Sequence, residues 1–177
     1  KTRYYENQDL LILNVLKTLS SDCDLYIKEH NAAIGLRNSK FYKKILKYEN
    51  SHILDHNFNL NNNLSSFDLV ISQAGTVCYE AAIKKIPSFT FADCFFNKLK
   101  DSFKINIEDL KNCEDIKHLL KLKIAQNDTK LSLDEFEKFL LERSFEGNIM
   151  GIYNNPDVIK DKNIKILAHE LKKLFSI

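Results

Sequence analysis

The chain has 177 residues, of which 44% are hydrophobic and 28% are charged, and its formal net charge is +2 at pH 7. This length fits one domain with a sizeable core. The small net charge excludes the bulk electrostatic footprint of a nucleic-acid-binding protein, so we expect no nucleic-acid partner. No apolar run approaches the roughly 20 residues of a membrane span.

The four cysteines, Cys23, Cys78, Cys94 and Cys113, are widely spaced along the chain. They form no Cys-x-x-Cys pair and no metal-ligand spacing. We therefore expect free thiols, a reducing cytoplasmic location and no metal ion. Cys78 is expected to pack into the core.

Short apolar runs alternate with amphipathic segments through the first half of the chain. The predicted helices span 7–20, 39–46, 61–66 and 76–86. The predicted strands span 24–27, 52–54, 69–71 and 88–91. Ser39 is the expected cap of the second helix, and Leu46 is expected on its buried face. Strands that alternate with helices over short loops favour an α/β class with a Rossmann-like parallel sheet and helices on both faces.

The pattern changes after the fourth strand. We expect a short strand near 103–106, followed by a helix that Asn106 caps and that continues through Leu120. A capping box opens a helix at 132–140, a loop rich in glycine and asparagine covers 147–156, and a last helix spans 161–175. We expect residues 1–177 to form a single α/β domain that ends in these helices.

The most informative stretch is 68–82, which reads Asp-Leu-Val-Ile-Ser-Gln-Ala-Gly-Thr-Val-Cys-Tyr-Glu-Ala-Ala. An apolar strand turns there into a helix, and Gly75 can take a positive φ in the turn. The first amides of such a helix have no partner within it and attract phosphate. Glu80 follows Thr76 by one helical turn and can accept hydrogen bonds from a ribose. We predict a turn that holds the phosphates of a nucleotide-sugar, although strand–glycine–helix turns also occur without a ligand.

Ligands of open parallel sheets bind outside the carboxyl ends of the strands. Three candidate sites fall there: His30 after the first strand, the turn at Gly75 and Thr76 after the third, and Asp93 after the fourth. His30 can donate to a phosphate oxygen, and Arg37 in the next loop can contact phosphate or carboxylate with two hydrogen bonds. Each also has a structural reading, as a strand-end histidine, a solvated loop arginine or a turn-capping aspartate.

Several motifs occur in the order in which one known family carries them. They are Tyr26-Ile-Lys-Glu-His30, Gly35-Leu-Arg37, Phe41-Tyr42, the Gly75 turn from Asp68 to Ala81, and Ile86-Pro87. Over roughly 26–91 the chain resembles the carboxy-terminal half of bacterial capsule and surface-polysaccharide glycosyltransferases of the GT-B type, such as Kdo transferases. It departs from that pattern at Asn31, where the family has proline, and at Ile86, where glycine is usual.

The resemblance implies one half of a GT-B fold and a nucleotide-sugar donor with CMP, UDP or GDP as its carrier, with no other cofactor. His30 is the implied catalytic residue, Glu80 the implied ribose ligand. The implied phosphate-site residues are Ser72, Gly75 and Thr76, and besides Glu80 we expect Arg37, Gln73 and Asp93 to bind the substrate. The implied reaction transfers the sugar to a glycan or lipid-linked acceptor in capsular or surface-polysaccharide biosynthesis.

In the GT-B arrangement, the acceptor site and often the catalytic base belong to an amino-terminal domain. The chain begins at Lys1 instead of Met, so we expect a piece of a larger protein that lacks this domain and does not turn over alone. We also expect peripheral association with the inner face of a membrane. Two alternatives remain open: a sugar-nucleotide epimerase or polyol-phosphate transferase of the same fold, and a non-catalytic α/β binding or scaffold module.

Overall fold

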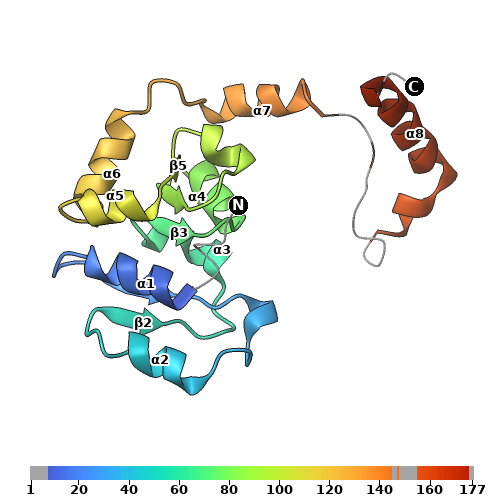
Figure 1. Ribbon diagram of the computed structural model, residues 1–177. Helices are drawn as coiled ribbons and strands as arrows, with labels where there is room; N and C mark the ends of the chain where they lie inside the picture. Colours follow the sequence, from blue (N-terminus) through green and yellow to red (C-terminus); the bar gives the residue numbers. More distant parts are fainter. Residues whose placement is uncertain (1–7, 145–146, 148–154, 176–177) are drawn as a thin grey trace. The chain divides into compact units, whose positions relative to one another are not determined.

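The computed structural model describes residues 8–144, 147 and 155–175 and divides the chain into two compact units (Figure 1). Unit 1 ends at Leu133, and unit 2 begins at Asp134. Unit 1 contains all the strands of the described residues, whereas the described part of unit 2 is helical.

Five strands of three residues each form parallel pairs in unit 1 (Figure 1). Strand β1 (Leu25–Ile27) pairs with β2 (Ser51–Ile53), and β4 (Ser88–Thr90) lies between β3 (Val70–Ser72) and β5 (Ser102–Lys104). The predicted α/β class with parallel strands is confirmed. The strands form two sheets instead of one, because the structure contains no hydrogen-bonded pairing between β1 and β3 among the residues it describes.

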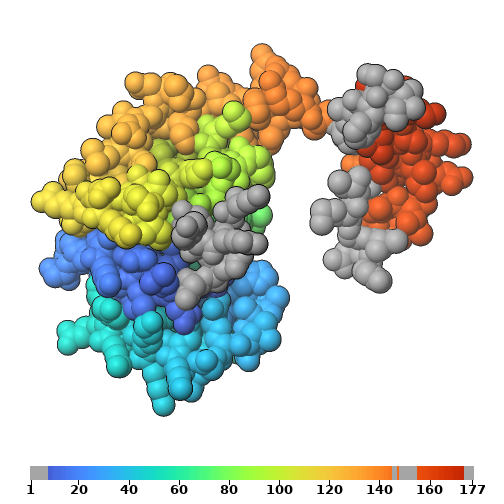
Figure 2. All heavy atoms as spheres, viewed as in Figure 1, coloured from blue at the N-terminus to red at the C-terminus, as the bar shows by residue number. Residues whose placement is uncertain are grey.

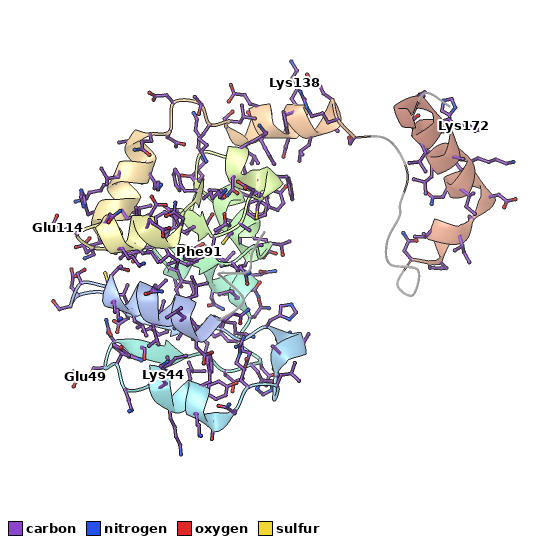
Figure 3. The ribbon with its side chains drawn as sticks, viewed as in Figure 1. Lys44, Glu49, Phe91, Glu114, Lys138 and Lys172 are labelled. Carbon is purple, nitrogen blue, oxygen red and sulfur yellow. The ribbon has the colours of Figure 1, made fainter. Side chains whose placement is uncertain are left out.

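Helices cover both faces of the three-stranded sheet (Figure 1). One face packs against α1 (Gln8–Lys17), α5 (Ile107–Asn112) and α6 (Ile116–Ala125). The buried residues of this core are Val15, Phe89, Phe91, Phe103, Ile105, Leu110, Ile116 and Leu119. Phe91 lies in the interior of unit 1 (Figure 3). Burial of these side chains is the main driving force for folding of the unit.

The opposite face of this sheet meets α4 (Val77–Ile83) and α3 (Leu60–Asn63). It carries Ser88, Thr90 and Ser102, which are all completely buried. The Ser88 hydroxyl donates to the Cys78 carbonyl oxygen at 3.0 Å, and the amide of Asn97 donates to the Thr90 and Ser102 hydroxyls at 2.9 and 3.1 Å. Each buried hydroxyl therefore has a partner, as burial of a polar group requires.

The smaller sheet is covered on one face by α1 and α2 (Ser39–Ile45). Leu16 of α1 packs there with Phe41 and Ile45 of α2. Because successive strand residues point to opposite faces, Tyr26 leaves this core and stacks on His52 with the ring centres 4.9 Å apart.

Both ends of α2 differ from the sequence-based expectation. Asn38, and not Ser39, caps the helix, because its side-chain oxygen accepts from the Phe41 amide at 3.2 Å. Leu46 was expected to be buried but is 55% exposed. It follows the last helical residue and lies about 100° around the axis from Ile45.

The helix predicted from Asn106 through Leu120 is two helices. Asn106 caps the first as expected, in a capping box with Asp109. Asp115 then accepts from the His118 amide at 2.7 Å and starts α6. A second cap inside the predicted segment supplies hydrogen bonds to a new helix start and so separates the two helices.

Two further helices follow, α7 (Leu133–Leu141) and α8 (Asp161–Phe175), and both agree with the predicted helices at 132–140 and 161–175. The loop predicted at 147–156 lies largely outside the described residues. Within the described part of the chain, none of the helices combines the length and the apolar character that a membrane crossing requires.

The core predicts a large asymmetry between two phenylalanines. Phe89→Ala removes a ring that is completely buried in the central strand, and we expect it to lower the free energy of unfolding by about 3–5 kcal/mol. Phe95→Ala is the matched control, because that ring is 56% exposed, and it should cost about 1 kcal/mol or less. Urea unfolding measures both; similar losses for the two variants would contradict the assignment of the core.

Candidate functional site

The carboxyl ends of β1 and β3 open onto one cavity of about 950 Å³, which we call the main cavity. Residues after β1, including Lys28 and His30, line it together with Ser72 and Gly75 after β3 and Glu80 on α4. The main cavity therefore brings together residues that are more than 40 positions apart in sequence.

His30 follows β1, and a hydrogen bond fixes which ring nitrogen carries the proton when the side chain is neutral. It caps the short helix η2 (Asn31–Ala33), and its Nδ1 accepts from the Ala32 amide at 3.1 Å. When the ring is neutral, an accepting Nδ1 requires that the proton is on Nε2. The ring can then donate from Nε2 to an anionic group in the main cavity.

The turn after β3 is held by Ser72 and Gly75. The Gly75 amide donates to the Ser72 hydroxyl oxygen at 3.0 Å, so this amide is not one of those left open to phosphate. Gly75 does not have the positive φ that the sequence suggested; among the described glycines only Gly35 and Gly147 do. Glycine is required here for space, because a Cβ at position 75 would lie 2.6 Å from the Ser72 Oγ.

Helix α4 begins directly after this turn. The Cys78 amide already donates to the Gly75 carbonyl oxygen at 3.1 Å, so Val77 carries the open helical amide of this first turn among the described residues. Thr76 is the cap residue and makes no side-chain capping hydrogen bond. Both Thr76 and Val77 line the main cavity. Because α4 has only seven residues, the polar side chains around it matter more than its dipole.

Glu80 is half-buried on α4 and lines the main cavity. Its carboxylate makes no hydrogen bond or ion pair within the described part of the chain. A half-buried acceptor without a partner favours a ligand that donates hydrogen bonds, such as a diol.

Arg37 lies in a different arrangement from the one that the sequence suggested. Its Nε donates to Glu29 Oε1 at 2.5 Å, its Nη2 donates to Gln8, and its guanidinium stacks on the Phe41 ring at 4.6 Å. Tyr42 donates to the other oxygen of Glu29. The guanidinium of Arg37 is therefore already paired with a carboxylate.

This Glu29–Arg37–Tyr42 cluster lines a second cavity of about 320 Å³ beneath α1. Gln73, predicted as a substrate-binding residue, lines this second cavity and not the main one, whereas His30 and Ser72 line both. The two cavities are thus adjacent and separated by residues at the ends of β1 and β3.

Asp93 is the predicted site residue that the structure does not bring to either cavity. Its exposed carboxylate pairs with Lys104 at 2.7 Å, next to β4 and β5. The strand end was predicted correctly, but the side chain is used in a surface ion pair, which contributes little to stability.

The aromatic and amide-bearing wall of the main cavity was not predicted from the sequence. Its aromatic members are Tyr26, Phe58 and Phe67, and Tyr26 meets Phe67 edge to face with ring centres 5.9 Å apart. Asn57, Asn59 and Asn61 line the same wall. The asparagine-rich loop was the available signal, together with the outward position of Tyr26 in its strand.

The four cysteines are free thiols. Burial raises the pKa of the Cys78 thiol to about 12, so this side chain stays neutral and inert in the core, as predicted. The described residues contain no group of histidine, cysteine and acidic side chains that could hold a metal ion.

The Ser72–Gly75 contact allows a test of whether the Ser72 hydroxyl excludes a side chain at position 75. Gly75→Ala should lower the free energy of unfolding by about 1–3 kcal/mol, because its Cβ meets the Ser72 hydroxyl. Ser72→Ala in the same chain removes that hydroxyl, so the double variant should be more stable than the sum of the single losses predicts. Additive losses in a urea-unfolding cycle would contradict this account of the turn.

The Tyr42–Glu29 hydrogen bond predicts an alkaline dependence of stability. The Glu29 carboxylate, which accepts from the phenol, raises the pKa of Tyr42 above its usual value near 10. A group whose pKa is higher in the folded state stabilises fully below its unfolded pKa and loses this effect as the pH rises through the folded pKa. Tyr42→Phe should therefore lower the melting temperature at pH 8, and the difference from the parent chain should shrink above pH 10.

Comparison with protein-family models, with curated proteins and with solved structures finds no significant match to this chain.

Proposed function

We propose that unit 1 is the donor-binding domain of a glycosyltransferase in capsular or surface-polysaccharide biosynthesis, and that the main cavity takes a nucleotide-sugar. The observation that carries the proposal is the meeting of His30, Ser72 and Glu80 in one cavity. These three residues come from the motifs that resemble polysaccharide glycosyltransferases, and they are the ones that such a donor needs near its phosphates and its ribose.

The phosphate end of the donor lies between the strand ends. Lys28 supplies positive charge, Lys28 and His30 supply N–H donors, and the Ser72 hydroxyl can donate because its oxygen already accepts from Gly75. Lys28 keeps a fixed position, since its Nζ donates to the Glu29 carbonyl oxygen at 2.8 Å and to Asn31 at 3.2 Å. The open Val77 amide of α4 adds a further donor.

The nucleoside occupies the rest of the main cavity. The unpartnered Glu80 carboxylate accepts from the ribose hydroxyls one helical turn beyond Thr76. Phe58 and Tyr26 provide apolar surface for the base, and the neighbouring asparagine side chains offer amide donors and acceptors to its edge. A volume of about 950 Å³ is at the upper end of the range typical of small-molecule sites, which suits a nucleotide-sugar.

The reaction breaks the bond between the sugar and the nucleotide phosphate while an acceptor hydroxyl attacks the sugar. Negative charge develops on the leaving phosphate, and donors that are already in place stabilise it. His30 acts in this way from Nε2. The acceptor site and the catalytic base belong to a further domain of a longer protein, so we expect unit 1 to bind the donor without turning it over. This enzyme works in the cytoplasm, where the four thiols stay reduced.

The experiment is a titration of the full chain with CMP, UDP and GDP followed by amide chemical shifts. One of these nucleotides should give saturable shifts at Gly75, Thr76 and Val77 and around His30. His30→Ala and Glu80→Ala should each weaken binding by roughly 10-fold or more, because each removes a hydrogen bond to a charged group.

Matched controls are Glu108→Ala and His169→Ala, which remove an exposed carboxylate and an exposed imidazole that do not line the main cavity. Neither should change the dissociation constant. Absence of saturable shifts with all three nucleotides would overturn the proposal. The interpretation of the chain as a non-catalytic α/β module would then be favoured.

A further inference from the structure

The loop after β1 and helix α2 carry an unusual run of positive charge. Between His30 and Tyr48 the chain has five cationic side chains and no carboxylate. Arg37 is neutralised by Glu29, but the other four, Lys40, Lys43, Lys44 and Lys47, are exposed. None of these four lysines makes a hydrogen bond or an ion pair in the described part of the chain.

Helix geometry places the four lysines together. Phe41 and Ile45 are buried and fix the inner face of α2. At about 100° per residue, Lys40 and Lys43 fall on the outer side of the helix and Lys44 on the adjoining flank, and Lys47 continues on the outer side beyond the helix end. Lys44 lies on α2 at the surface of unit 1 (Figure 3). The lysines therefore form a ridge that faces solvent.

Large apolar side chains are exposed beside this ridge. Leu36 is 78% exposed, Ile34 is 47% exposed, and Leu46 is exposed at the other end of α2. Gly35, with a φ of +77°, turns the chain between Ile34 and Leu36. We call residues 34–47 the basic surface; they form a contiguous part of the molecular surface, in light blue and cyan (Figure 2).

We propose that the basic surface docks on an anionic lipid bilayer. The lysines match the negative charge of the headgroups, and Leu36 and Ile34 enter the boundary between headgroups and acyl chains. Peripheral binding of this kind combines electrostatic attraction with burial of apolar area. A soluble polyanion would match the charge but would leave the two apolar side chains in water.

The location of the basic surface gives this docking a consequence for unit 1. The loop that leads into the basic surface starts directly after His30. Arg37 and Phe41, which belong to the basic surface, line the second cavity. A bilayer that binds residues 34–47 therefore lies next to the carboxyl ends of the strands, where a lipid-linked group can approach. The docking does not depend on which ligand the main cavity takes, so it can be tested without any nucleotide.

The test is sedimentation of the full chain with vesicles of pure phosphatidylcholine and with vesicles that contain 30% phosphatidylglycerol (about 30% anionic lipid is a common choice for detecting such surfaces). We expect binding to the anionic vesicles alone, weakened when the NaCl concentration is raised from about 0.1 to 0.5 M. The combined variant K40Q/K43Q/K44Q/K47Q should lower the partition coefficient by about 100-fold or more. Leu36→Ser should lower it by about 10-fold.

A charge-matched control is K111Q/K121Q/K162Q/K165Q, which neutralises four exposed lysines outside the basic surface, two of them on α8. It should bind anionic vesicles nearly as well as the parent chain. Far-UV circular dichroism and thermal melting verify that each variant is folded. An equal loss in the control variant, equal binding to both kinds of vesicle, or no binding by the parent chain would each overturn the proposal. Tight binding to dextran sulfate that Leu36→Ser leaves unchanged, together with unchanged vesicle binding by that variant, would favour a polyanion partner instead.

Discussion

Strands β1 and β3 contribute to the same core and end at the same cavity, yet they do not hydrogen-bond to each other. Leu25 and Ile71 both pack against the core that α1 covers, so a shared apolar core joins the two sheets where no backbone ladder does. The space that a ladder would have closed is occupied by the two cavities. The whole candidate site depends on this separation, since its residues come from the ends of two strands that belong to different sheets.

The local structure was largely predictable because short apolar runs and helical periodicity are strong signals in this chain. The strand before Ser72, the helix after Thr76 and the cap at Asn106 all follow from residue type and spacing. The split into two sheets was not predictable, because pairing partners depend on contacts between distant segments. The second cap at Asp115 was missed since an aspartate in an amphipathic run gives no sign of whether it caps or faces water.

The candidate site was predictable at the level of which residues meet, and much less so for what each side chain does. His30, Ser72 and Glu80 follow from the rule that strand ends gather at one edge of a parallel sheet. The pairing of Arg37 with Glu29 depends on a loop conformation, and loops are the part of a fold that periodicity does not describe. Gly75 was recognised for the wrong reason: its small size matters, and its backbone freedom does not.

The buried hydroxyl of Ser88 joins α4 to the sheet and restricts how this helix can move. Ser88 bonds to the Cys78 carbonyl oxygen, and the Cys78 thiol in turn lies 3.4 Å from the Phe89 carbonyl oxygen. Hydrogen bonds are directional, whereas apolar contacts tolerate sliding, so a shift of α4 along the strands would break these contacts with the sheet. A lateral shift of α4 that would widen the main cavity for a larger ligand is therefore unfavourable.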